Sequence, residues 1–202
     1  MKATEHPRNL GLAQRMLVVD PHGHRVADAR VGDLIRMLGP GDVVVVNDAA
    51  TVPGSIAVTA PSGRRHELRL VTRLREGRWC AVLMGEGDWR EDTDGRPPPD
   101  ALGVGAALHA RSGAFRIHAV DARSPRLVTV DFVPPAGVSP LEWLYDVARP
   151  IQYSYASRPC ATREVQGPFA ARPWAVEMPS AGRPLRVSLI LKLRAAGVEV
   201  RR

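Results

Sequence analysis

Six short apolar segments between residues 54 and 133 place the strongest constraint on the fold of this chain. They read GSIAVTA, HELRLVTR, RWCAVLM, GVGAALHA, AFRIHAVD and RLVTVDFV, and Gly- and Pro-bearing breaks separate them. Several alternate apolar and polar residues with a period of two, as a strand with one buried face does. Six such strands predict a closed antiparallel β-barrel, because closure removes edges that aggregate. Residues 85–101, GEGDWREDTDGRPPPDA, are acidic and turn-rich, so we expect an exposed loop within the barrel.

The segment before the predicted barrel has the pattern of an α/β unit. Val31, Leu34, Ile35 and Leu38 recur at the spacing of one helix face, and the Gly-Pro-Gly turn that follows would end this helix. Four consecutive valines in DVVVVND, residues 42–48, then predict a strand covered on both faces. A helix that leads into a buried strand is typical of an α/β layer.

Helix and strand patterns return after the barrel. Ser139 and Glu142 form a capping-box pattern with Pro140 at the first helical position, and a last helix is expected from Pro184. The run VEV that follows this last helix begins another strand. We therefore predict α/β with inserted β. A discontinuous α/β domain, residues 1–56 and 135–202, is interrupted by a roughly six-stranded antiparallel β-barrel, residues 57–134.

Composition excludes several classes of protein. No run approaches the roughly 18 apolar residues of a membrane span, and the first residues lack the apolar core of a secretory signal. Two distant cysteines, Cys80 and Cys160, do not make a disulfide framework, so we expect a reducing cytoplasm. The six histidines show no ligand spacing, and no metal is expected.

The net charge of +7 lies entirely in the last quarter of the chain. From Arg149 onward there are ten Lys and Arg against three acids, and nine of the ten bases are Arg. Arginine matches phosphate and carboxylate geometry, which indicates an anionic partner. The alternative is an ordinary solvated surface in a chain that uses Arg wherever it needs a base.

Asn47 and Asp48 follow the four valines and form the first candidate site. Ligands of parallel α/β sheets gather at the carboxyl ends of strands, and Asn and Asp offer both donors and acceptors there. The alternative interpretation is an Asx-turn that ends the strand.

The second candidate site is the stretch Pro179-Ser180-Ala181-Gly182-Arg183, directly before the last helix. Its small side chains let a ligand lie against the main chain, and the first N–H groups of a helix are unpaired. Arg183 adds a fixed positive charge at the same point. We therefore expect a polar small molecule to bind at this loop.

These stretches, taken in order, resemble the S-adenosylmethionine:tRNA ribosyltransferase-isomerase family of queuosine synthesis. The resemblance is carried by LGPGDVVVVNDAATVPGSI, RPIQYSY, EVQGPFAARPWAVEMPSAGRPL and LILKLRAAGVEV, and it is closest to actinobacterial variants with Glu-Met-Pro-Ser-Ala-Gly-Arg-Pro. It runs over essentially the whole chain, strongly at both ends and weakly in the barrel. The ordered set of motifs is specific, although no single motif is.

The resemblance implies an enzyme that moves the ribosyl group of S-adenosylmethionine onto 7-aminomethyl-7-deazaguanine in tRNA and isomerises it. S-adenosylmethionine would be a substrate, and no cofactor is implied. The positions that fall on family-like motifs are Asn47, Asp48, Tyr153, Gln166, Pro179, Ser180, Ala181 and Gly182. By this resemblance Asp48 would serve polar contact or proton transfer, and the others, with Arg183, would contact substrate. The Arg-rich last quarter would suit tRNA phosphates.

The chain also departs from the family pattern. Ala49-Ala50 stands where the family usually has Thr-Arg, and Val165-Gln166-Gly167-Pro168 stands for Tyr-Gln-Thr-Val. Family members extend well beyond the point where this sequence stops, so the chain is C-terminally short by the resemblance. Three hypotheses remain open: a tRNA enzyme completed by a second chain or a homo-oligomer, a diverged homologue acting on S-adenosylmethionine or another small molecule, and a non-catalytic half that binds a partner.

Overall fold

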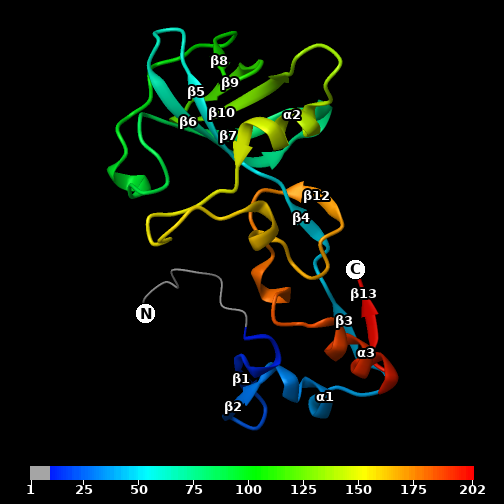
Figure 1. The fold of residues 1–202 in the computed structure, drawn as a ribbon. Helices are drawn as coiled ribbons and strands as arrows, with labels where there is room; N and C mark the ends of the chain where they lie inside the picture. The colour runs from blue at the N-terminus through cyan, green and yellow to red at the C-terminus, as the bar shows by residue number, and fades with distance from the viewer. Residues whose placement is uncertain (1–9) are drawn as a thin grey trace. The chain divides into compact units, whose positions relative to one another are not determined.

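The computed structural model describes residues 10–202, which form two compact units (Figure 1). One unit comprises Thr51–Val165 and Trp174–Glu177. The other comprises 10–50, Gln166–Pro173 and Met178–Arg202. Within the described residues no helix is long and apolar enough to cross a membrane.

The first unit is a closed β-barrel of six antiparallel strands, which confirms the predicted architecture. Its strands are β5 (Ser55–Thr59), β6 (Arg65–Arg73), β7 (Trp79–Met84), β8 (Ala107–His109), β9 (Ala114–Asp121) and β10 (Ser124–Val133). The order is β5-β6-β7-β10-β9-β8, and a pairing of Thr59 with His109 closes the ring between β5 and β8. A short strand, β11 (Ala148–Arg149), adds to the free part of β5. Short 3₁₀ turns, η3 (Arg75–Gly77) and η4 (Thr93–Gly95), lie in its loops.

Helix α2 (Pro140–Val147) belongs to the core of this barrel. Its start is as predicted, because the amide of Glu142 donates to the Ser139 hydroxyl at 3.2 Å. Trp143 is 1% exposed and stacks on Phe115 with ring centroids 4.7 Å apart. The barrel unit therefore takes in more of the chain than the predicted insert 57–134, since α2 packs into the barrel.

Gly113 makes this packing possible. Its φ is +82°, and a Cβ there would lie 2.5 Å from the carbonyl oxygen of Val133 and 2.9 Å from the Trp143 ring. Only glycine fits such a close approach without strain.

The second unit contains a hairpin, a parallel strand pair and two short helices. Strands β1 (Arg15–Asp20) and β2 (Arg25–Arg30) form the hairpin, and β3 (Val43–Val45) pairs in parallel with β13 (Glu199–Arg201). The helices are α1 (Leu34–Met37) and α3 (Val187–Ala195), with turns η1 (Gly11–Ala13), η2 (Val31–Asp33) and η6 (Ser180–Gly182). A small core gathers around Val31, Leu189, Ile190, Leu193 and Val198. The strands β4 (Ala49–Thr51) and β12 (Arg172–Ala175) pair with each other, and each has residues in both units. The turn η5 (Thr162–Val165) ends the long segment of the barrel unit.

Two sequence predictions about this unit were wrong. The valine strand is not covered on both faces, because Val43 and Val45 are exposed and only the opposite side packs on the core. The last helix begins at Val187 rather than Pro184, since the chain first makes the turn η6 and Arg186 is extended, with φ −72° and ψ 151°.

Candidate functional site

Asn47 and Asp48 leave β3 in different environments. The side-chain oxygen Oδ1 of Asn47 accepts a hydrogen bond from the amide of Ala49 at 2.9 Å, which makes the Asx-turn, and Asn47 itself is exposed. Asp48 is 6% exposed and accepts two hydrogen bonds from Arg172, from Nε at 3.1 Å and from Nη2 at 2.8 Å. The Arg172 guanidinium holds the pKa of this carboxyl below its usual value, against the opposing effect of burial. Asp48 is therefore ionised and already paired.

The backbone of Asp48 also anchors the segment Gln166–Pro173. The amides of Ala171 and Arg172 donate to the Asp48 carbonyl oxygen at 2.8 and 3.1 Å. Arg172 was not among the predicted site residues, because 124 positions separate it from Asp48 and no local pattern links them.

The loop Pro179–Gly182 forms the turn η6. The amide of Gly182 donates to the Pro179 carbonyl at 3.3 Å, and that of Arg183 donates to the Ser180 carbonyl at 3.1 Å. Ser180 and Ala181 are exposed, and within residues 10–202 their amides make no hydrogen bond. Two main-chain donors that have no hydrogen-bond partner among residues 10–202 thus belong to exposed residues of this turn, as the small side chains predict.

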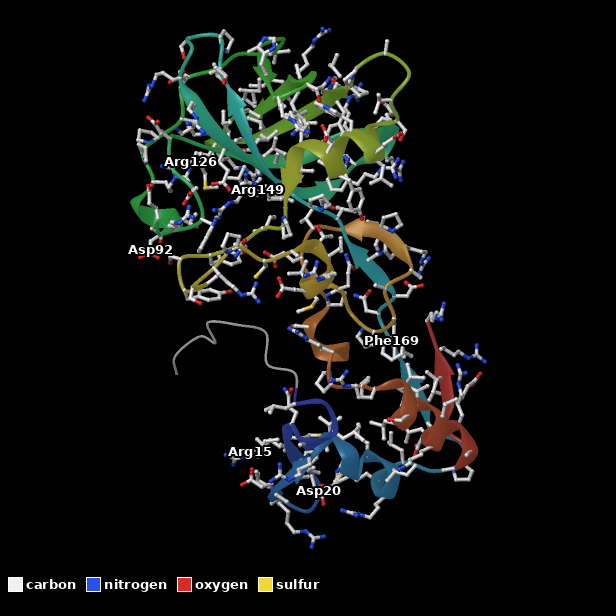
Figure 2. The ribbon with its side chains drawn as sticks, in the orientation of Figure 1. Arg15, Asp20, Asp92, Arg126, Arg149 and Phe169 are labelled. Atoms are coloured by element: carbon white, nitrogen blue, oxygen red, sulfur yellow. The ribbon has the colours of Figure 1, made fainter. Side chains whose placement is uncertain are left out.

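The segment Gln166–Pro173 brings the loop and Asp48 into one neighbourhood. The Phe169 ring, labelled in Figure 2, would lie 3.7 Å from a side chain added at Gly182. The carbonyl oxygen of Pro179 would lie 4.0 Å from one added at Gly167. The segment therefore contacts both Asp48 and the loop Pro179–Gly182, and Gln166 is part of it. Asn47 directly precedes Asp48 in the chain.

Tyr153 is a residue of the barrel unit. Its hydroxyl donates to the Glu177 carboxylate, its ring stacks on Tyr155 at 5.7 Å, and the Arg69 guanidinium lies 5.8 Å from the ring centre. Burial, together with the bond to Glu177, raises the pKa of Tyr153 to about 12. The phenol therefore stays neutral and acts as a donor.

A buried ionic cluster in the barrel escaped the sequence analysis. Glu67 accepts from Arg69 Nε at 2.7 Å, from Arg96 Nη1 at 2.7 Å and from the Ser55 hydroxyl at 2.6 Å. Arg96 also donates to the carbonyl oxygens of Gly85, Glu86, Gly87 and Asp88. The predicted loop 85–101 is consequently tied to the barrel at Arg96, which is 2% exposed.

A groove of about 710 Å³ lies beside this cluster, with Ser55, Glu67, Trp89, Arg111 and Arg149 among its lining residues. Figure 2 labels Arg149 and Asp92 in the barrel unit. The groove is lined by the barrel unit alone, so none of the predicted site residues of the other unit contributes to it. Among the residues that the structure describes, no group of three His, Cys, Asp or Glu side chains could hold a metal ion.

The fold and this neighbourhood define an α/β protein that carries a β-barrel and offers open main-chain amides at a small-residue turn before a helix. The chain belongs to the family described as queuosine biosynthesis protein, whose model matches residues 2–202. This confirms the family that the ordered motifs resemble.

Curated relatives carry the name S-adenosylmethionine:tRNA ribosyltransferase-isomerase. A protein of Thermus thermophilus is 31% identical over 200 residues, which are 96% of this chain and 53% of the relative. That of Xanthomonas oryzae is 31% identical over 191 residues, 93% and 49% of the two chains. This chain therefore spans about half the length of the curated relatives it matches.

A solved S-adenosylmethionine tRNA ribosyltransferase from Thermotoga maritima aligns with 98% of this chain and 52% of its own length. The identity is 17% and the TM-score 0.38, values at which the likeness carries no argument.

Proposed function

We propose that this chain supplies the S-adenosylmethionine-binding part of a tRNA ribosyltransferase-isomerase. The activity would transfer the ribosyl group of S-adenosylmethionine to 7-aminomethyl-7-deazaguanine in tRNA and isomerise it. Family membership supports the reaction class. The observation that carries the binding site is the pair of open amides at Ser180 and Ala181.

The loop is suited to oxygen and nitrogen lone pairs of a polar ligand. Two adjacent amides can donate to one acceptor group, and Arg183 adds a positive charge next to them in the chain. Small side chains at Ser180 and Ala181 leave the main chain accessible. We therefore assign Pro179, Ser180, Ala181, Gly182 and Arg183 to substrate contact.

Asn47 and Asp48 would bind a second part of the substrate. The side-chain carbonyl of Asn47 is used in the Asx-turn, so the side-chain NH₂ group is the donor left for a ligand. An ionised carboxylate held by two hydrogen bonds from Arg172 is a weak proton acceptor. We therefore assign Asp48 a polar contact with the substrate rather than proton abstraction. Asp48 also orients the segment Gln166–Pro173, in which Gln166 is assigned to substrate contact.

Titration calorimetry with S-adenosylmethionine tests this site. Ala181→Leu would cover the two amides, and losing two hydrogen bonds of about 1 kcal/mol each weakens binding about 30-fold. Ala27→Leu, at an exposed position of β2, is the matched control and should bind like the wild type. Equal affinity of Ala181→Leu and the wild type, or no binding by the wild type, would count against the site.

The tRNA partner requires its own experiment. An electrophoretic shift with unmodified tRNA at several salt concentrations should show affinity that falls steeply with salt, because basic residues release counterions from phosphates. Binding of S-adenosylmethionine without any binding of tRNA would favour the alternative, a diverged homologue that acts on a small molecule. We also assign Tyr153 to substrate contact. The same electrophoretic shift, carried out with Tyr153→Phe, tests this assignment.

A further inference from the structure

The groove beside the buried ionic cluster is built from several parts of the barrel unit. Residues of β5 and β6 line it, and there the Ser55 hydroxyl donates to the Glu67 carboxylate at 2.6 Å. The loop that carries Trp89 and the strand β11, whose Arg149 is opposite Ser55, complete the lining. A volume of about 710 Å³ is typical of a site for a small molecule.

The loop part of the lining is held in place by buried hydrogen bonds. The Arg96 guanidinium donates to the carbonyl oxygens of Glu86 and Gly87 at 3.1 and 2.9 Å. Gly87 has φ +130°, and a Cβ there would lie 2.5 Å from the Arg96 Nε, so only glycine fits this approach. A lining that is already ordered binds a ligand at a low cost in conformational entropy.

Four arginines line the groove, and two of them are free to bind an anion. Arg90 and Arg111 form ion pairs with neighbouring acidic residues. The side chains of Arg65 and Arg149 make no ion pair or hydrogen bond within residues 10–202. The position of Arg149 is fixed through its backbone, because its carbonyl oxygen accepts the Gly54 amide at 3.0 Å. Such a guanidinium is suited to a phosphate or a carboxylate.

The acidic residues of the lining limit the charge of the ligand. Glu67 is neutralised by Arg69 and Arg96. The four other carboxylates, equal in number to the lining arginines, are those of Glu86, Asp88, Glu91 and Asp146. A long polyanion would meet as much repulsion as attraction in such a groove, because its charge would lie beside both signs. The lining therefore favours a ligand with one anionic group and an otherwise uncharged body.

Trp89 supplies a planar apolar surface to the same groove. The Arg90 guanidinium lies 4.7 Å from the ring centre and covers one face of the indole. No aromatic ring in the described part of the chain stacks on Trp89, so the opposite face can accept a planar group. Nucleobases stack on aromatic side chains in this way, whatever their sequence.

We propose that this groove is a nucleotide-binding site, in which the base stacks on Trp89 and the phosphate binds Arg149. The nucleotide is either free or presented by an RNA, and the chemistry of recognition is the same in both cases. The site goes beyond the proposed function, because its lining residues belong to the barrel unit and the loop Pro179–Gly182 does not.

Titration calorimetry with adenosine 5′-monophosphate tests the site. Arg149→Gln removes the cation and Trp89→Ala removes the stacking surface, and each should weaken binding about tenfold. The matched controls are Arg73→Gln and Tyr145→Ala, at exposed positions of the barrel unit outside the groove, which should bind like the wild type. Equal affinity of both groove variants and the wild type, or no binding by the wild type, overturns the proposal.

Two fragments of the nucleotide make the same test without any substitution. Adenosine lacks the phosphate and ribose 5-phosphate lacks the base, so each should bind the wild type at least about tenfold more weakly than the nucleotide. Adenosine that binds as tightly as the nucleotide contradicts the role of Arg149. Ribose 5-phosphate that does so contradicts the role of Trp89.

S-adenosylmethionine distinguishes this site from the proposed substrate site. In excess it should not displace adenosine 5′-monophosphate, and Arg149→Gln should bind it like the wild type. Displacement would mean that the two ligands share one site, which overturns the proposal. A wild type that binds the nucleotide in the groove but no S-adenosylmethionine refutes the proposed function and leaves this inference standing.

The source of the nucleotide follows from competition with tRNA. If tRNA displaces adenosine 5′-monophosphate, and Arg149→Gln weakens the binding of both, the RNA presents the nucleotide. If tRNA and the nucleotide bind together, the ligand of the groove is the free nucleotide. Both results support a nucleotide site, and they assign it to different ligands.

Discussion

Glu67→Gln is the substitution that most directly tests how the barrel unit is stabilised. Glu67 is 5% exposed and is the shared carboxylate of Arg69 and Arg96, whose side chains are 9% and 0% exposed. Glutamine has nearly the same shape and keeps an acceptor for Ser55. It leaves two buried guanidinium groups with no carboxylate between them. Removing one partner of a buried ion pair costs about 3–5 kcal/mol, and the retained hydrogen bonds place this case at about 3 kcal/mol.

Urea unfolding monitored by tryptophan fluorescence measures this loss of stability in the barrel unit. The four tryptophans, Trp79, Trp89, Trp143 and Trp174, all belong to the barrel unit. With a slope of about 2 kcal/mol per molar urea, a loss of about 3 kcal/mol moves the midpoint down by about 1.5 M. The control is Glu76→Gln, because Glu76 pairs with Arg78 on the surface, where its side chain is 70% exposed. That substitution should cost less than about 1 kcal/mol.

Acid should reproduce the effect of Glu67→Gln in the wild type. Burial raises the pKa of Glu67, but hydrogen bonds from Arg69, Ser55 and Arg96 outweigh it and leave the pKa below the usual 4.5. The stabilisation is therefore complete above pH 4.5 and is lost as the pH falls through the folded-state value. The difference between wild type and variant should shrink over that range. Midpoints of Glu67→Gln and Glu76→Gln that coincide at neutral pH would refute the reasoning.

Two further predictions concern titrating groups near the candidate sites. Tyr153 should ionise near pH 12, so the ultraviolet difference spectrum between wild type and Tyr153→Phe should develop its phenolate band there. A band at pH 10 would contradict the raised pKa that partial burial and the bond to Glu177 give this phenol. The hydrogen bond from Arg158 lowers the pKa of Glu164 from 4.5 to about 2. Because a lowered folded pKa stabilises above the unfolded value, Glu164→Gln should destabilise at neutral pH and match the wild type below about pH 2 in thermal unfolding. A constant gap between the two melting temperatures across this range would exclude Glu164 as the cause.

The barrel was predictable because its signal is local. Period-two alternation and the Gly- and Pro-bearing breaks identify each strand, and closure follows from the number of strands. The turn at Ser180–Gly182 was also found from local chemistry, since small residues before a helix are visible in the sequence.

The errors share a different cause, which is dependence on distant residues. The pairing of Asp48 with Arg172 joins positions 124 apart, so no local sequence pattern at either residue indicates the other. The loop 85–101 is largely exposed, as its composition predicts, but Arg96 within it is buried by carbonyl groups of the loop itself, a geometry that composition does not contain. The exposure of Val43 and Val45 depends on what packs above them, and four valines alone read as a covered strand.

The pairing of β3 with β13 also sets an order of events during synthesis. Val43 leaves the ribosome early but pairs with Glu199, whereas the strands that complete the barrel all lie between them in the chain. The barrel can close while the valine strand still waits for its neighbour, because contacts between sequence-distant segments form late. Until translation reaches Glu199, the nascent chain holds four consecutive valines without the strand that pairs with them, an exposed apolar segment of the kind that favours aggregation.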